Sequence, residues 1–189
     1  MSEHTRTQSS ELIPASRMAM WWVLAGEAVI FGGLIASYLL LRMRHSEWSA
    51  YASHTVEWAG IVNTSVLLTS SYLVVLAHHA AHQGDYKKAS RWLGITVLCG
   101  LVFLCIKSYE YSHEIAHGFT PTANLFWSFY FAMTGLHGLH VIAGMIALGW
   151  VALRVRKGEN PQRVEYAGMY WHLVDIVWIF LFPLLYLSS

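Results

Sequence analysis

Five ionisable side chains lie in the middle of strongly apolar stretches of the sequence: Glu27, His137, His140, His172 and Asp175. A charge at the centre of a bilayer costs about 2.5–3.5 kcal/mol on insertion scales, so such residues normally face the interior of a helix bundle. His137 and His140 are three residues apart, and so are His172 and Asp175, which places each pair on one helix face. Three kinds of chemistry are open to such a cluster: metal or haem ligation, proton relay, or a polar network that fixes helix packing.

The spacing of these residues argues against a metal or haem site. Bundle di-iron sites combine Glu with Glu-x-x-His motifs, and no such motif lies on the stretches that carry these five residues. A di-haem membrane cytochrome would need paired histidines along each of two spans, which these spans lack. We therefore expect no catalytic residue, metal or cofactor in this chain. Between proton relay and a structural polar network, the residues alone favour the network.

Glu27 lies too deep in its apolar stretch to reach the membrane surface. It is about ten residues, or about 15 Å of helix rise, into a helix that crosses about 30 Å. An unpaired acid there costs several kcal/mol, so we expect a hydrogen-bond partner among His137, His140, His172 or nearby hydroxyls. Asn63 begins an Asn-Thr-Ser sequence inside another apolar stretch, where hydrogen bonding between helices is the better interpretation than glycosylation.

Composition places the chain in a membrane. It is 56% hydrophobic and 12% charged, whereas soluble domains average roughly 25% charged. Spans of about 20 apolar residues predict an all-α, polytopic fold with five transmembrane helices in one bundle. The expected organisation is a polar tail over residues 1–17 and a membrane domain over 18–189, with helices at 18–42, 57–81, 91–113, 124–153 and 167–187. The net charge of +1 gives no indication of nucleic-acid binding.

Basic residues are distributed unevenly between the two sides of the predicted membrane domain. Nine Lys and Arg residues fall in the tail, at 82–91 or at 154–166, which share one side, and the opposite side has only Arg42 and Arg44. The positive-inside rule therefore predicts a cytoplasmic N-terminus and an outside C-terminus. Gly135, Gly138 and Gly144 predict a face of close helix approach, which we expect to meet a partner subunit.

Three histidines, His78, His79 and His82, end the second predicted span on the basic side. They have the residue type for collecting protons or binding a metal ion. Their position at the end of a span favours the simpler interpretation, that they are solvated residues at the membrane surface.

Several motifs, in matching order and spacing over residues 18–187, resemble subunit III of the haem–copper oxidases. The first are Trp-Val-Leu-Ala-Gly-Glu-Ala-Val-Ile-Phe at 22–31, Asn-Thr-Ser-Val-Leu-Leu at 63–68 and Ala-His-His at 77–79. Glu110 between two tyrosines follows. The most specific are Gly-Leu-His-Gly-Leu-His-Val at 135–141 and Tyr-Trp-His-Leu-Val-Asp-Ile-Val-Trp at 170–178.

The resemblance implies a place in a respiratory complex of the bacterial inner membrane that passes electrons from cytochrome c or quinol to oxygen and pumps protons. The haems and coppers lie in subunits I and II, and subunit III carries no redox centre. It packs on subunit I, binds phospholipid, and supports proton uptake and turnover stability. Glu27 matches the family's buried glutamate, and Arg154 matches a basic residue associated with lipid headgroups.

Longer members of that family have seven helices, of which this sequence matches five, so the extra pair is either absent or supplied by another subunit. The asparagine motif and the double histidine resemble the cytochrome c oxidase branch, which we favour. Subunit III of a quinol oxidase and an accessory subunit of a nitric-oxide-reductase system are the alternatives. A free-standing membrane cytochrome and a small transporter are more remote ones.

Overall fold

Polar turns and connections separate five long helices in the computed structural model, which describes residues 15–44, 48 and 55–187. The helices are α1 (Ala15–Arg42), α3 (Glu57–His82), α4 (Tyr86–Ala116), α5 (Leu125–Val155) and α6 (Arg163–Tyr186). Each is long and apolar enough to cross a membrane, and the described residues contain no strand. The predicted all-α fold with five spans is confirmed. The expected polar tail lies outside the described residues except for the first turn of α1.

Three helices begin earlier than the hydropathy pattern indicated, and α1 does so at Ala15 rather than at residue 18. α4 begins at Tyr86 rather than at residue 91, because Asp85 caps it by accepting a hydrogen bond from the Lys88 amide at 3.1 Å. Gly84, with φ +77°, makes the sharp turn out of α3 just before this cap. α6 likewise begins at Arg163 rather than 167. Hydropathy marks the part of a helix inside the hydrocarbon, whereas a cap marks where the helix itself begins.

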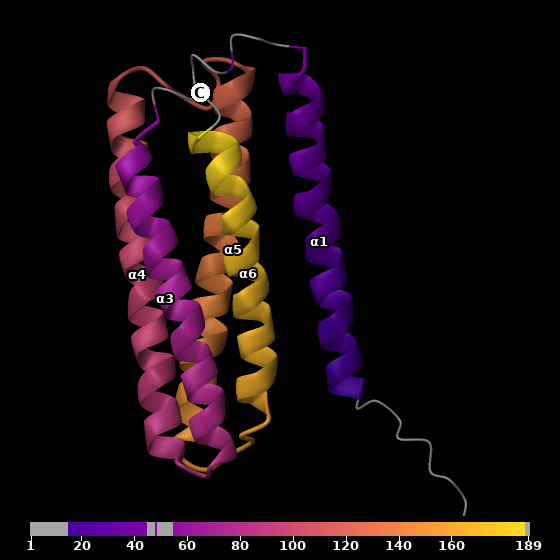
Figure 1. The fold of residues 1–189 in the computed structure, drawn as a ribbon, viewed down its shortest axis with the longest axis vertical. Coiled ribbons are helices and arrows are strands. Elements are labelled where there is room, and N and C mark those ends of the chain that lie inside the picture. The colour runs from indigo at the N-terminus through magenta and orange to yellow at the C-terminus, as the bar shows by residue number, and fades with distance from the viewer. Residues whose placement is uncertain (1–14, 45–47, 49–54, 188–189) are drawn as a thin grey trace, which may run out of the picture.

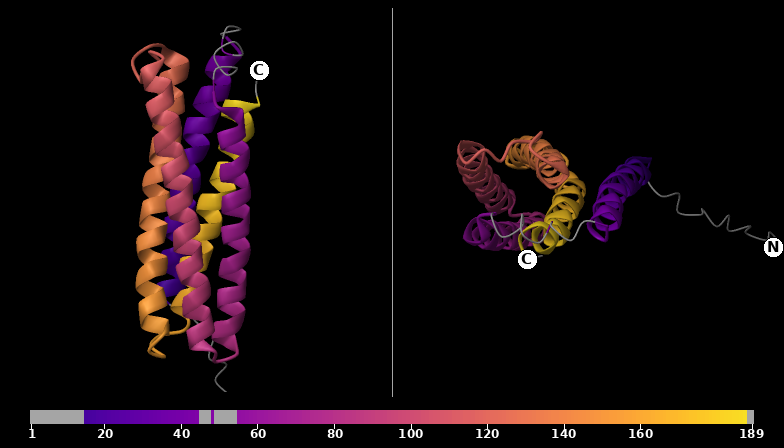
Figure 2. Two further views of the ribbon diagram at one scale, coloured as in Figure 1. Left: turned by 90° about the vertical axis from the view of Figure 1, so that its left-hand side faces the viewer. Right: turned by 90° about the horizontal axis from the view of Figure 1, so that it is seen from above.

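Four of the helices surround a common core, and the fifth stands at its edge. Viewed from above, α3, α4, α5 and α6 form a ring, and α1 lies outside it beside α6 (Figure 2). The α1 helix packs mainly on α6 and less on α5. Of the most apolar 18-residue stretch of α1, only 11% is buried within the protein, against 44% of the corresponding stretch of α6. The core therefore belongs chiefly to α3–α6.

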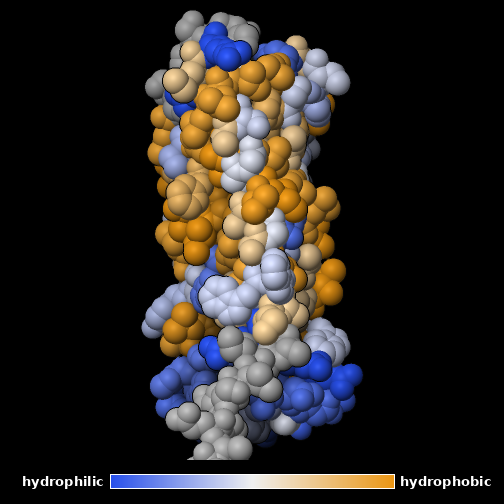
Figure 3. Space-filling model, turned by 90° about the vertical axis from the view of Figure 1, so that its right-hand side faces the viewer, coloured by the Kyte–Doolittle hydropathy of each residue, from blue (hydrophilic) through white to orange (hydrophobic). Residues whose placement is uncertain are grey.

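The two ends of the bundle carry different parts of the chain. The α3–α4 and α5–α6 turns lie at the end where α1 begins, and the C-terminus lies at the opposite end (Figure 1). On the face that includes α1, a hydrophobic band separates a strongly hydrophilic end from a smaller hydrophilic group at the other (Figure 3). This is the surface of a protein whose middle faces hydrocarbon.

Glycines let the helices of the bundle approach each other closely. A Cβ added at Gly144 would lie 2.8 Å from Trp171, and one at Gly100 would lie 2.8 Å from Met145. The prediction that the glycine face of α5 meets a partner subunit is wrong at Gly144, because Trp171 of the same chain fills that space. A small residue permits close approach but does not reveal whether the neighbour belongs to the same chain.

Candidate functional site: polar side chains inside the bundle

An acid and a histidine join α1 to the bundle near the middle of both helices. Glu27 Oε2 of α1 lies 2.7 Å from His140 Nε2 of α5, and the two side chains are 19% and 15% exposed. The atoms are at ion-pair distance, although their alignment falls short of a hydrogen bond. Phe31 packs edge-on against the same imidazole, with ring centres 5.1 Å apart. Of the three histidines expected as partners of Glu27, the structure brings His140 to it.

The other nitrogen of His140 contacts the backbone of its own helix. Nδ1 lies 2.7 Å from the Leu136 carbonyl oxygen, which only accepts, so Nδ1 carries a proton. Nε2 is then the nitrogen that faces the Glu27 carboxyl group.

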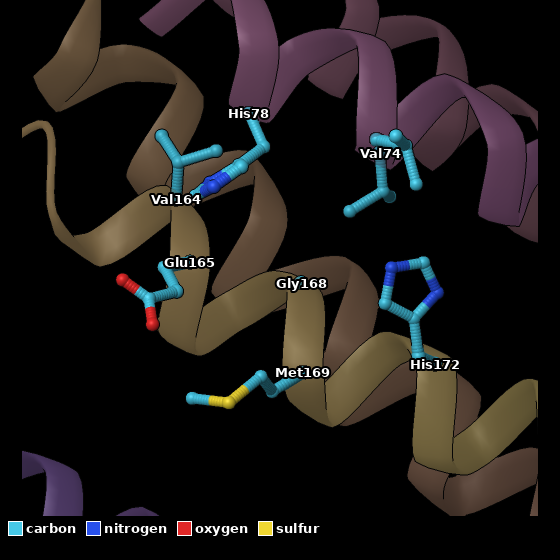
Figure 4. Close-up of a pocket in the computed structure, with 8 residues that line it drawn as sticks. Val74, His78, Val164, Glu165, Gly168, Met169 and His172 are labelled. Carbon is cyan, nitrogen blue, oxygen red and sulfur yellow. The ribbon is translucent and has the colours of Figure 1, made fainter. Parts of the chain in front are cut away.

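His172 lies in a groove between α3 and α6. Its Nδ1 is 2.6 Å from the Ser71 hydroxyl of α3. The groove has a volume of about 190 Å³ and is lined mostly by apolar side chains. Figure 4 shows His172 at one end of the groove and His78 and Glu165 toward the other. Glu165 lies 3.7 Å from the Arg17 guanidinium of α1. A row of ionisable groups thus runs inward from the end where α1 begins.

Three of the expected polar residues are buried without a hydrogen-bond partner among the described residues. They are Asn63, His137 and Asp175, each 3% exposed or less. The His137 ring packs against Phe103 and Trp178, with ring centres 5.5 and 5.3 Å away. The Ser71 hydroxyl that contacts His172 also lies near the Asp175 carboxyl group, without the geometry of a hydrogen bond. Among the described residues, the contacts that join these polar groups to other side chains are those of Glu27 with His140 and of His172 with Ser71.

The most densely connected polar cluster surrounds Lys107 of α4, which is 5% exposed. Its ammonium lies 3.0 Å from Glu110 Oε2, 3.0 Å from the Tyr130 hydroxyl and 2.8 Å from the Tyr186 hydroxyl. Tyr130 also donates to Glu110 Oε1 at 2.8 Å. The three protons of the ammonium therefore have three acceptors, on α4, α5 and α6. This cluster, hereafter the Lys107 cluster, ties together the ends of three helices.

Sequence reasoning did not assemble the Lys107 cluster, although its charged members were visible. Lys107, Glu110 and Glu114 follow one another at intervals of three and four residues, which places all three on one face of α4. Glu114 is 1% exposed, and neither of its carboxyl oxygens has a hydrogen-bond partner among the described residues. A lysine with two acids at this spacing inside a span was the signal that would have found the cluster.

The same stretch of α4 contains a second motif that the sequence reasoning passed over. His113-Glu114-Ile115-Ala116-His117 has the His-Glu-x-x-His pattern of zinc-dependent proteases. In such enzymes the glutamate acts at the metal, but here Glu114 is buried in the bundle while His113 and His117 are exposed. The arrangement therefore lacks the general base that this proteolytic chemistry requires.

Arg154 lies at the end of α5 on the basic side of the molecule. Its guanidinium donates to Glu159 at 2.8 Å, and this hydrogen bond lowers the pKa of the Glu159 carboxyl. The guanidinium groups of Arg154 and Arg163 lie 5.3 and 4.7 Å from the centre of the Trp150 ring. Among the described residues, no carboxylate pairs with Arg163. Together Trp150, Arg154 and Arg163 form a cationic and aromatic patch, hereafter the Trp150 patch.

In the part of the chain that the structure describes, no three His, Cys, Asp or Glu side chains are grouped so as to hold a metal ion.

Comparison with known proteins identifies the family. The family model for cytochrome c oxidase subunit III matches residues 14–189. The chain belongs to the cytochrome c oxidase subunit III family. The match covers all five helices.

Relatives in this family include subunits of two oxidase types. The chain is 37% identical to cytochrome c oxidase subunit 3 of Thermostichus vulcanus, over 88% of this chain and 84% of the relative. It is 36% identical to the Corynebacterium diphtheriae subunit of the same name, over 86% and 83%. It is 34% identical to cytochrome bo(3) ubiquinol oxidase subunit 3 of Pseudomonas aeruginosa, over 89% and 83%. The chain is thus a multi-pass subunit III of a haem–copper oxidase of the cytochrome c or quinol type.

Proposed function

We propose that this chain is the non-redox subunit III of a bacterial cytochrome c oxidase. In this proposal it packs on subunit I, leaves haem and copper to subunits I and II, binds phospholipid, and supports proton uptake and turnover stability. The observation that carries the proposal is the contact between Glu27 and His140. In a subunit of this family, a paired acid that joins a peripheral helix to the bundle is suited to hold the subunit's shape.

The test is substitution of Glu27 in the assembled oxidase. We expect Glu27→Ala to leave the initial rate of electron transfer unchanged and to reduce subunit III retention in detergent or the number of turnovers before inactivation. Glu27→Gln keeps a polar group beside His140 and should have a smaller effect. The matched control is Glu57→Ala, because Glu57 is exposed at the start of α3. Normal retention and normal lifetime in Glu27→Ala would remove the proposed role.

Support for proton uptake is the second part of the proposal. The groove that leads from His78 and Glu165 to His172 supports it, because imidazole groups exchange protons near neutral pH. We expect His78→Ala with Glu165→Gln to slow proton uptake by the assembled oxidase, measured by stopped flow with a pH dye. The control is His79→Ala, an exposed neighbour that does not line the groove. Equal uptake rates in the two variants would contradict this role.

Phospholipid binding is proposed at the Trp150 patch. Arginines beside a tryptophan at the end of a span suit the phosphate of a lipid headgroup. We expect Arg163→Ala to reduce the phospholipid that co-purifies with the oxidase, measured by mass spectrometry after mild detergent extraction. Arg91→Ala removes an exposed arginine elsewhere on the same side and should leave the lipid content unchanged. Equal lipid content in both variants would exclude the Trp150 patch as the phospholipid-binding site.

The proposed orientation places the N-terminus in the cytoplasm. It rests on the nine-to-two distribution of basic residues. The test uses single cysteines in a chain without Cys99 and Cys105. A membrane-impermeant maleimide added to intact cells should label Thr122→Cys, in the α4–α5 connection, and should miss Gln83→Cys, in the α3–α4 turn. The reverse pattern would overturn the orientation.

A quinol oxidase is the second candidate, favoured by the similarity to the Pseudomonas aeruginosa subunit and to a probable quinol oxidase subunit 3 of Staphylococcus epidermidis. The purified complex distinguishes the two. Oxygen consumption with reduced cytochrome c, and none with quinol, supports the first proposal. The opposite result assigns the chain to a quinol oxidase.

A further inference from the structure

The exposed end of α4 carries two histidines one helical turn apart, His113 and His117. Their ring centres are 4.3 Å apart and the rings are tilted by 38°. Two imidazoles on one tetrahedral zinc ion, at Zn–N distances of about 2.0–2.1 Å, have ring centres about 5 Å apart, so the two rings need to separate by roughly 1 Å to bind the ion. Both side chains are exposed, so an ion has direct access to them.

A backbone contact prepares His117 for metal binding. Its Nδ1 lies 2.8 Å from the His113 carbonyl oxygen, so Nδ1 carries the proton and Nε2 presents a lone pair. Histidines that bind metals commonly donate their other ring N–H to a carbonyl or carboxylate, which fixes both the tautomer and the ring orientation. No hydrogen bond or ion pair engages the ring nitrogens of His113 among the described residues. Both histidines therefore have a nitrogen available.

We propose that His113 and His117 form a two-histidine site for a divalent zinc ion on the surface at the end of the bundle opposite the start of α1. Water completes the coordination, because the nearest acid in the sequence, Glu114, is buried on the other side of the helix. The bound ion links His113, in the last turn of α4, to His117, which follows the last residue of the helix. This site is separate from the polar groups inside the bundle and needs no redox centre.

The test is a calorimetric titration of the full-length chain in lipid nanodiscs with zinc chloride. The reference is the variant His78→Ala with His82→Ala, which removes the other histidine pair at this spacing in the described residues. We expect the reference to bind one equivalent of zinc. His113→Ala or His117→Ala added to the reference should each weaken binding by at least tenfold. A reference that binds no saturable equivalent would overturn the proposal.

Two matched variants separate zinc binding from other effects. His79→Ala removes one exposed helical histidine and should change the affinity less than twofold. Glu114→Gln should also change it less than twofold, and a tenfold loss would show that the acid is a ligand and the two-histidine assignment is wrong. Circular dichroism of the zinc-free variants verifies their helix content. With Cu²⁺ as a paramagnetic probe, nitrogen couplings from two imidazoles should appear in the reference and be lost in both histidine variants; couplings that persist there would place the ion elsewhere.

Discussion

Lys107 Nζ lies 2.8 Å from the hydroxyl of Tyr186, although 79 residues separate the two in the chain. The contact brings the final turn of α6 to the C-terminal third of α4. The rings of Tyr111, Tyr130, Trp178 and Tyr186 surround the same ammonium at 4.9–5.7 Å from their centres. The charge is therefore held by a carboxylate, two hydroxyls and several aromatic faces.

Replacing Lys107 should destabilise the chain strongly. Lys107→Met leaves Glu110 buried without its cation, and breaking a buried pair from one side costs about 3–5 kcal/mol. Adding Glu110→Gln removes the stranded charge, so the double variant should unfold at a higher temperature than Lys107→Met alone. Unfolding in detergent, followed by circular dichroism, measures both. Lys88→Met, at an exposed position, is the control. If Lys107→Met alone were as stable as the double variant, the result would contradict the ion pair between Lys107 and Glu110.

The space around a glycine should decide whether its replacement by alanine lowers or raises the free energy of unfolding. Gly144→Ala places a methyl group 2.8 Å from Trp171, and overpacking of this kind costs about 1–3 kcal/mol. Gly149→Ala on the same helix meets nothing within 4 Å and should stabilise the helix by up to about 1 kcal/mol. Thermal unfolding of the two variants compares them directly. Equal effects would show that α5 and α6 are not packed as described.

Glu114 should carry a proton at neutral pH. Its carboxyl group is 1% exposed and lacks hydrogen-bond partners in the described part of the chain, and an ionised form there would be costly. Infrared spectra of the full chain should show the carbonyl stretch of a protonated acid that shifts in D₂O and is lost in Glu114→Gln. Glu57→Gln, at an exposed acid, should leave that band in place. A spectrum unchanged by Glu114→Gln would refute protonation.

Glu159 should make stability depend on pH in the acid range. Its hydrogen bond from Arg154 lowers the folded-state pKa, so its contribution to stability is present above the unfolded value of about 4.3 and is lost as pH falls through the folded value. Arg154→Gln should raise the pKa of Glu159, measured by carboxyl-carbon NMR titration. Arg156→Gln should leave the pKa of Glu159 unchanged, because Arg156 does not contribute to lowering it. The same titration curve in wild type and Arg154→Gln would exclude the ion pair in solution.

Hydropathy was sufficient to predict the five spans, because a membrane requires about 20 apolar residues whatever the fold. The depth of Glu27 in its span predicted a partner among three histidines or nearby hydroxyls, and the structure places His140 there. Choosing among the three from sequence was impossible, since that depends on the rotation of each helix about its own axis. The packing of His137 among aromatic rings was likewise not predicted from the sequence.

Other features escaped prediction for reasons specific to each. The partners of Lys107 come from three helices, so no single segment shows the cluster. Gly144 has the pattern expected for a contact with another subunit, and the same pattern serves a contact with Trp171. The start of α4 depends on the capping side chain of Asp85, which lies outside the apolar stretch.

The weak burial of α1 has a consequence for how the chain opens. Only 11% of its most apolar stretch is buried. Its polar contacts to the ring include the Glu27–His140 contact and a hydrogen bond from the Tyr38 hydroxyl to the Leu184 carbonyl oxygen at 3.1 Å. The remaining helices keep their own core when α1 moves away, so the free energy of releasing α1 is lower than that of unfolding the whole chain. In a lipid bilayer we therefore expect α1 to open and close as a separate cooperative unit beside the other four helices.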